Sequence, residues 1–244
     1  MASFEEFRDK LTGQRLAASR PDSTESDNSG VTQPMVTASR SAEAKEQHHD
    51  MSQPVCSVFP QGYRNKKGKA VMQNCPESSM SLQDIHAYII NYANAGLQTE
   101  QLRELSDKPM QRDFKMLNFK YATFCGIFSY RKSEHLQEES ELMVVDIDGM
   151  EAPEAAIELK RKLCADKHYV TALCFISPSE HGVKWVVERQ RLEGSTYKDE
   201  MNHMYNYMAF EYGIAIDTSG SDICRACYLP YDKDCYINSK YLKK

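Results

Sequence analysis

The segment from about residue 142 to residue 230 alternates apolar runs with amphipathic helices in one fixed order. One helix is predicted from Pro153 and another over residues 196–212. Four apolar runs predict strands, at residues 142–148, 169–177, 183–188 and 226–229. The order β-α-β-β-α-β is the ferredoxin-like, or split βαβ, arrangement. Right-handed crossovers then place the third strand between the first two and antiparallel to both.

The predicted fold class is α+β, with an RRM- or ferredoxin-like βαββαβ palm at about residues 142–230. Residues 51–140 are expected to form an α/β extension packed on the palm. Residues 51–244 would then be one domain, with subregions 51–140 and 141–244. Residues 1–50 predict a disordered tail, because they hold few large apolar residues and cannot offset the entropy lost on ordering.

Local signals place elements inside the extension. Ser81, with Asp84 three residues later, is typical of a helix N-cap with an acid at the third helical position. Ile85 and the apolar residues after it continue at helical spacing. A second short helix is expected from Thr99, and a strand over residues 121–129.

The net charge of −5 argues against a uniformly basic nucleic-acid-binding protein, so such contacts must come from local basic patches. The basic loop at residues 64–69 is more typical of a solvated turn than of a phosphate contact. The N-terminus lacks the basic-then-apolar order of a signal peptide. No apolar run approaches the roughly 18 residues of a membrane span. We therefore expect a cytoplasmic protein with no membrane partner.

Two aspartates end the first strand of the predicted palm. Asp146 and Asp148 are two positions apart, so both side chains point to one face. Two such carboxylates repel each other unless a cation lies between them, and oxygen ligands suit Mg²⁺ or Mn²⁺. Asp217, which follows the short apolar run 214–216, is a candidate third ligand.

The predicted strand order brings other polar residues to the same rim of the sheet. Lys184 and Arg225 are candidate cations for a triphosphate, Arg225 through a bidentate guanidinium. Ser177 and Ser179, with the turn at Gly182, can offer hydroxyls and backbone N–H groups to phosphate oxygens. The convergence of these segments favours phosphoryl-transfer chemistry more than any one residue does.

Each of these residues also has a purely structural explanation. A DxD sequence at the end of a strand is often a turn, and Lys184 can be a solvated strand residue. Arg225 can pair with Asp222 or Asp217 alone.

Cysteines raise a separate alternative. Cys224, Cys227 and Cys235 could indicate zinc, but a structural zinc site needs a fourth ligand at ordered spacing, and no second CxxC occurs. Buried reduced thiols are the favoured interpretation.

Residues 144–149 (VVDIDG), 175–186 (FISPSEHGVKWV) and 216–230 (IDTSGSDICRACYLP) together resemble the VirE-associated N-terminal domain family. Residues 114–128 resemble the same family upstream of the acids. That family occurs mainly on mobile or integrated elements of Bacteroidetes and is similar to a branch of the archaeo-eukaryotic primase superfamily. The resemblance covers about residue 55 to the C-terminus.

The resemblance implies metal ligands at Asp146, Asp148 and Asp217. It implies nucleotide-phosphate contacts at Ser177, Ser179, Lys184 and Arg225. The chain departs from the family pattern at three positions: Glu180 stands where Gly is usual, Cys224 where Ser is usual, and Lys184 where typical primases use His. Relatives often continue into a VirE-type P-loop ATPase or helicase, but no GxxxxGK[ST] occurs here. Either that partner is a separate protein that acts in trans, or this chain ends before it.

The leading hypothesis is a metal-dependent nucleotidyltransferase that synthesises primer or DNA from nucleoside triphosphates on a template, with Mg²⁺ or Mn²⁺, in the replication of a mobile or integrated element. A second is a non-catalytic module that binds nucleotide or nucleic acid for a replication ATPase. A third is a DxD phosphatase of the haloacid-dehalogenase type, with Asp146 as nucleophile. That fold requires parallel strands with helical crossovers, whereas the few residues from Ser179 to Lys184 predict a hairpin.

Overall fold

The computed structural model describes residues 53–191, 193–216 and 221–242. The predicted tail and Asp217 lie outside these residues. Within them, no helix has the length and apolar character needed to cross a membrane.

The elements before residue 140 are β1 (Val55–Phe59), β2 (Tyr63–Arg64), β3 (Ala70–Val71), β4 (Ser78–Ser81), α2 (Leu82–Ile90), α3 (Tyr92–Glu104), α4 (Lys108–Asn118), β5 (Tyr121–Thr123), β6 (Gly126–Phe128), a 3-10 turn (Ser133–His135) and β7 (Leu136–Glu139). The capping box predicted for the first helix is confirmed. The Asp84 N–H donates to the Ser81 hydroxyl at 3.2 Å, and the Ser81 N–H donates to the Asp84 carboxylate at 3.3 Å.

The elements after residue 140 are β8 (Leu142–Asp148), α5 (Pro153–Cys164), β9 (Thr171–Ile176), β10 (Gly182–Glu188), α6 (Tyr197–Tyr212), β11 (Cys227–Tyr228), β12 (Tyr236–Ile237) and a 3-10 turn (Ser239–Tyr241). The predicted strands and helices from residue 142 to residue 212 are therefore present. Pro153 begins α5, and Gly213 ends α6 with a φ of 67°, a left-handed conformation that glycine adopts readily.

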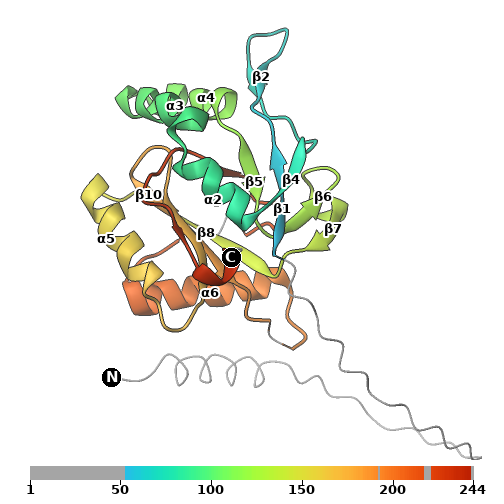
Figure 1. Ribbon diagram of the computed structural model, residues 1–244, viewed down its shortest axis with the longest axis vertical. Coiled ribbons are helices and arrows are strands. Elements are labelled where there is room, and N and C mark those ends of the chain that lie inside the picture. The colour runs from blue at the N-terminus through green and yellow to red at the C-terminus, as the bar shows by residue number, and fades with distance from the viewer. Residues whose placement is uncertain (1–52, 192, 217–220, 243–244) are drawn as a thin grey trace, which may run out of the picture. The chain divides into compact units, whose positions relative to one another are not determined.

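Two four-stranded sheets organise the domain (Figure 1). The first sheet has the strand order β11-β5-β1-β4, and the second has the order β12-β9-β10-β8. In the second sheet β10 lies between β8 and β9 and is antiparallel to both, as predicted. The fold is thus mixed α and β with antiparallel sheets.

A single apolar core joins one face of the second sheet to the first sheet and α2. It contains Val58 of β1, Ile85 of α2, Val144 of β8, Phe175 of β9 and Val186 of β10. Because side chains alternate along a strand, Asp146 and Asp148 continue the face that begins with Val144. The two aspartates therefore lie where this shared core reaches the rim.

Helices cover the opposite face of the second sheet. There α5 packs on β9 and β10, and α6 lies on the same side (Figure 1). Trp185 of β10 is fully buried and makes edge contacts with Tyr169 and with Tyr212 of α6. This face accounts for the near-continuous apolar character of β8 and β10, which are buried on both sides.

The predicted fourth palm strand, residues 226–229, was assigned to the wrong sheet. The strand β11 pairs with β5 in the first sheet, and the Leu229 N–H donates to the Lys120 carbonyl at 3.0 Å. Tyr228 packs against Tyr121 there, with ring centroids 6.1 Å apart. The edge of β9 that faces away from β10 pairs with β12, a strand that the sequence did not predict.

Local predictions in the extension needed three corrections. The strand expected over residues 121–129 is broken into β5 and β6 by a turn, and β6 pairs with β7. The helix expected from Thr99 begins earlier, at Tyr92, after Asn91 ends α2 and caps α3. Helix α4 was not predicted, although Asp107 caps it and Pro109 lies in its first turn. Outside the extension, the apolar run 214–216 that precedes Asp217 does not form a strand.

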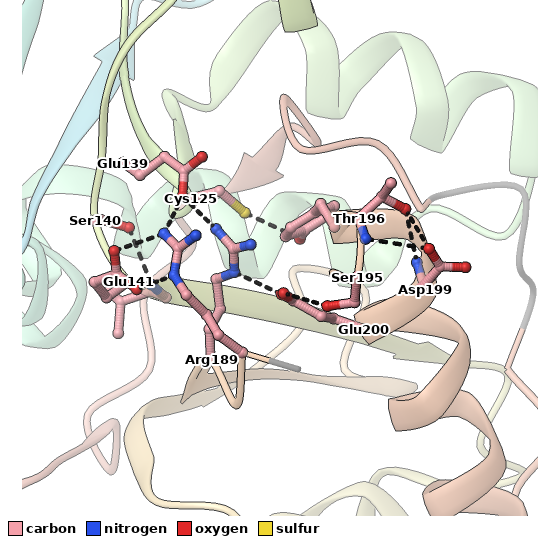
Figure 2. Close-up of polar contacts among 12 residues, drawn as sticks. Cys125, Glu139, Ser140, Glu141, Arg189, Ser195, Thr196, Asp199 and Glu200 are labelled. Atoms are coloured by element: carbon pink, nitrogen blue, oxygen red, sulfur yellow. Dashed lines mark hydrogen bonds and ion pairs between the residues drawn. The ribbon is translucent and has the colours of Figure 1, made fainter. Parts of the chain in front are cut away.

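A buried ion-pair network lies at the C-terminal end of β10, away from the two aspartates (Figure 2). The Arg189 guanidinium, whose side chain is 3% exposed, lies 2.8 Å from the Glu200 carboxylate of α6 and 2.7 Å from that of Glu139. Ser195 donates a further hydrogen bond to Glu200 at 3.2 Å. The network ties β7, the end of β10 and the start of α6 together.

We expect Glu200→Ala to lower the free energy of unfolding by about 3 kcal/mol, because it removes one partner of a buried ion pair. The matched control is Glu141→Ala. It removes a pair with Arg191 whose side chains are 62% and 49% exposed, so it should cost less than about 1 kcal/mol. Urea denaturation followed by circular dichroism measures both variants. Equal losses would contradict the structural importance of the buried pair.

Candidate functional site

The register between β8 and β10 sets the geometry of the candidate site. Lys184 lies directly opposite Asp146, and Gly182 lies directly opposite Asp148. Paired residues on neighbouring strands share a face, so the Lys184 side chain projects beside both aspartates. The rim predicted from the sequence therefore brings these three side chains together.

The carboxylate of Asp146 is held by two protein cations. Its Oδ1 accepts from the Lys184 ammonium, and its Oδ2 accepts from Nη2 of Arg225 at 2.7 Å. The side chains of Asp146 and Lys184 are only 12% and 9% exposed. Arg225 comes from the loop before β11, in the first sheet, so this contact joins the two sheets at the rim. The Arg225 side chain does not pair with the Asp222 carboxylate. Between these two residues, the backbone N–H of Arg225 donates to the Asp222 carbonyl.

The Lys184 ammonium lies between the two aspartates, 3.7 Å from Oδ1 of Asp148. Burial, with smaller contributions from the nearby cations Arg225 and Lys115, lowers the pKa of Lys184 to about 8. The direct contact with Asp146 favours the charged form. The lysine thus supplies, at neutral pH, a positive charge where two carboxylates meet.

Asp148 differs from Asp146 in exposure. Its side chain is 65% exposed, and it lies against the backbone of Gly182. A Cβ at Gly182 would come within 2.7 Å of the Asp148 carboxylate and 2.4 Å of the Ile147 carbonyl, so only glycine fits there. Partial desolvation raises the pKa of Asp148, while Lys115 and Arg225 oppose the increase.

The two serines lie in the turn between β9 and β10. Ser177 is buried, and its hydroxyl is 3.5 Å from that of Ser179. The Ser177 N–H donates to the Gly182 carbonyl at 2.8 Å, which closes the turn. His181 holds the turn against the loop after β8, because its Nδ1 is 3.0 Å from the Met150 carbonyl. Ser177 and Ser179 are therefore at the rim, beside Lys184 in sequence and in space.

Glu180, at the tip of this turn, has a φ of 58°. This is the left-handed region, which favours glycine and costs other residues about 1 kcal/mol. The backbone geometry gives a physical reason for the glycine expected at this position. The Glu180 carboxylate pairs with Arg103 of α3 at 3.4 Å, and Arg103 also donates to the Pro178 carbonyl at 3.4 Å.

Two basic residues near the rim were not assigned a role from the sequence. Lys115 of α4 acts electrostatically on both Asp148 and Lys184, and Arg103 holds the serine turn. Lys115 lies in the segment 114–128 that resembles the family, but the sequence does not indicate which way its side chain points. Finding it would have required recognising α4 and its direction.

The described residues supply two carboxylates for a divalent cation. No group of three His, Cys, Asp or Glu side chains arranged for a metal occurs in residues 53–191, 193–216 and 221–242. Mg²⁺ is often held by one or two carboxylates, with water and substrate phosphates as the other ligands. Asp146 and Asp148 are the two carboxylates at the rim that could hold such a cation, but both oxygens of Asp146 here accept hydrogen bonds from Lys184 and Arg225. Asp217 lies outside the described residues.

The cysteines proposed as alternative zinc ligands are separated. Cys227 and Cys235 belong to the core shared by the two sheets, whereas Cys224 packs with Phe59 and Tyr121. Burial raises the pKa of Cys227 to about 11, so its thiol is protonated. These positions agree with reduced core cysteines.

We expect Asp146→Ala to lower the free energy of unfolding by about 3 kcal/mol or more, because Lys184 and Arg225 lose their common partner in a buried setting. Asp148→Ala is the matched control and should cost less than about 1 kcal/mol, since that carboxylate is exposed. Thermal and urea unfolding would measure the difference. A larger loss from Asp148→Ala would show that the charge balance has been assigned to the wrong aspartate.

Residues 115–237 match the protein family described as BT4734-like, N-terminal domain. Comparisons with curated proteins and with solved structures found no match. The matched segment is just over half of the chain and runs from Lys115 through the aspartates, Lys184 and Arg225 to β12. The relationship to VirE-associated domains and to primases remains a prediction. The chain belongs to the BT4734-like N-terminal domain family.

Proposed function

We propose that the chain is a metal-dependent nucleotidyltransferase of the primase-polymerase type, with nucleoside triphosphates as substrates and DNA as template. The observation that carries the proposal is the contact of two protein cations, Lys184 and Arg225, with Asp146, beside a second carboxylate at Asp148. A simple salt bridge needs one cation, whereas a triphosphate needs several.

The cations would exchange partners when a nucleotide binds. In the free protein, Lys184 and Arg225 both pair with Asp146. A triphosphate oxygen can replace the carboxylate at each of them, and the Arg225 guanidinium can bind phosphate with two parallel hydrogen bonds. Ser177 and Ser179 would offer their hydroxyls to the same phosphates from the adjoining turn. The exchange would release Asp146 to act as a ligand.

Asp146 and Asp148 would together hold Mg²⁺ or Mn²⁺, with Asp217 as the proposed third acid. A bound divalent cation activates the attacking 3′-hydroxyl and stabilises the leaving phosphate oxygen. Lys115 would help to keep the Asp148 carboxylate charged, because a cation favours the ionised form.

Through the family resemblance, we also propose kinship with the primase superfamily and a role in replication. The arrangement of β8, α5, β9, β10 and α6 is compatible with an RRM-like palm, although β11 lies in the other sheet. On this proposal the chain serves replication of a mobile or integrated element. A VirE-type P-loop ATPase or helicase would act with it in trans.

A second candidate function is nucleotide or nucleic-acid binding without catalysis. It is favoured by the neutralisation of Asp146 and by the negative charge of Glu180 beside the serine turn. The phosphatase alternative has less support. Antiparallel β9 and β10 are joined by a turn, and that chemistry requires parallel strands with helical crossovers.

Template-dependent extension of a primer, with labelled nucleotides and Mn²⁺ or Mg²⁺, tests catalysis. We expect the wild-type protein to synthesise product and Asp148→Ala to reduce the rate by about 100-fold or more, because a ligand of the reacting centre is lost. Asp148 carries this test because its variant is expected to fold. Glu211→Gln, an exposed acid of α6, is the control and should keep full activity.

Unchanged synthesis in Asp148→Ala, checked against Asp146→Ala, would exclude the catalytic proposal. Nucleotide binding that depends on Lys184 and Arg225, with no synthesis under any metal condition, would favour the second candidate.

Glu180 offers a test of the phosphate side of the site. Glu180→Gln and Glu180→Gly both remove one negative charge and the half-buried ion pair with Arg103, so we expect each to bind nucleoside triphosphate roughly two- to fivefold more tightly. Only the glycine variant relieves the left-handed backbone, and it should be about 1 kcal/mol more stable than the glutamine variant. Calorimetric titration and urea unfolding give the two quantities. Weaker nucleotide binding in both variants would contradict a phosphate site at this turn.

A further inference from the structure

We propose that one face of α4, together with the tip of the β2–β3 hairpin, binds the backbone of a single-stranded nucleic acid and leads it to the rim at Asp146. This inference rests on the proposed function and adds the surface that would hold the strand. We call this surface the basic track. Its six cations are Lys66, Lys67, Lys69, Lys108, Arg112 and Lys115.

The α4 part of the track is a stripe along one face of the helix. Lys108, Arg112 and Lys115 follow at intervals of four and three residues, which places them one above another. The stripe spans about 10 Å at 1.5 Å per residue. Lys108 and Arg112 are exposed, and Lys115 is half-buried.

The stripe ends at the candidate site. Helix α4 contacts α3, whose Arg103 pairs with Glu180 in the turn between β9 and β10 at 3.4 Å. Lys115 is the half-buried residue of the stripe, so the stripe meets the rim at Lys115. Lys108 lies about two helical turns farther along α4. A strand bound along the stripe would therefore have one end at the two aspartates.

The cations of the stripe have no ion-pair partner in the described part of the chain. Among residues 53–191, 193–216 and 221–242, no carboxylate forms an ion pair with Lys108, Arg112 or Lys115. The nearby acids have other partners. Asp107 caps α4 by accepting the Met110 N–H at 2.7 Å, and Asp113, on another face of α4, pairs with Arg64 at 3.5 Å.

The hairpin continues the positive charge beyond α4. It projects from the body of the domain next to α4 (Figure 1), and Lys66, Lys67 and Lys69 at its tip are all exposed. The tip is ordered by hydrogen bonds, because the Asn65 side chain accepts the N–H groups of Lys67 and Lys69 at 3.0 and 3.1 Å. A defined turn that presents cations outward suits phosphate contacts better than a flexible loop does.

The base of the hairpin is fixed to α4. The Gly62 N–H donates to the Met116 carbonyl at 2.7 Å, next to Lys115 in the chain. A Cβ at Gly62 would meet the Val71 carbonyl at 2.4 Å, so the close approach requires glycine. Tyr63, which follows, is 52% exposed and offers an aromatic ring on which a base can stack. The hairpin is therefore held beside α4.

Nucleic acid explains this surface better than a general attraction for anions. The whole chain carries a net charge of −5, so the positive charge is concentrated locally. The track is extended, lies beside an exposed tyrosine and ends at a site proposed to act on nucleotides. Single-strand binders combine these same features, a basic path for the backbone and aromatic rings for the bases.

The test compares two double variants with the same change in charge. Lys108→Gln/Arg112→Gln removes two cations of the track, while Lys115 is left intact because it belongs to the site. The control, Lys162→Gln/Lys167→Gln, removes two exposed cations in and just after α5. Affinity for a fluorescent 20-nucleotide single strand is measured by anisotropy at several salt concentrations.

We expect the α4 variant to bind the oligonucleotide at least about tenfold more weakly and to lower the slope of log K against log salt by about 1.4, which corresponds to two lost phosphate contacts. The control should keep the wild-type slope, and Lys66→Gln/Lys67→Gln should resemble the α4 variant. Affinity for nucleoside triphosphate with Mn²⁺ should be unchanged in all of them, so failure of the track and failure of the nucleotide site can be distinguished.

Three results would overturn the inference. The α4 variant could match the control, the wild-type protein could bind nucleotide but no oligonucleotide, or it could bind vesicles of anionic lipid while ignoring the oligonucleotide.

Discussion

The antiparallel pairing of β8 with β10 fixes the charged groups at both ends of the second sheet. At one end it places Lys184 opposite Asp146 and Gly182 opposite Asp148. At the other end it delivers Arg189 to the buried pair with Glu200. A shift of one residue would turn each of these side chains to the other face of the sheet, because the side-chain period of a strand is two.

The charge balance around Asp146 is the central electrostatic feature of the rim. Two cations and one largely buried carboxylate leave a net positive charge, and the exposed Asp148 reduces it. Burying these charged groups costs free energy unless each has a partner of opposite charge. The contact of Arg225 with Asp146 supplies such a partner and joins the two sheets at the edge of the shared core. A ligand with phosphate oxygens and a divalent cation would satisfy the same charges in a second arrangement.

The first sheet and its helices contribute more to the rim than the core alone requires. Arg225 enters from the loop before β11, Lys115 from α4, and Arg103 of α3 holds the turn that contains the serines. The strands of the second sheet supply the carboxylates and Lys184. The candidate site is therefore formed between two parts of the domain, and neither part contains it alone.

The sequence by itself determined the elements whose signals are local. The capping box at Ser81, the strands and helices from residue 142 to residue 212, and the common face of Asp146 and Asp148 all follow from periodicity and capping within about ten residues. Only the tertiary structure decided which sheet receives β11, which strand covers β9, and where α4 directs its lysines. These choices depend on contacts between distant segments, such as Arg225 with Asp146, 79 residues apart, and a two-residue strand such as β11 has too few side chains to specify its partner locally.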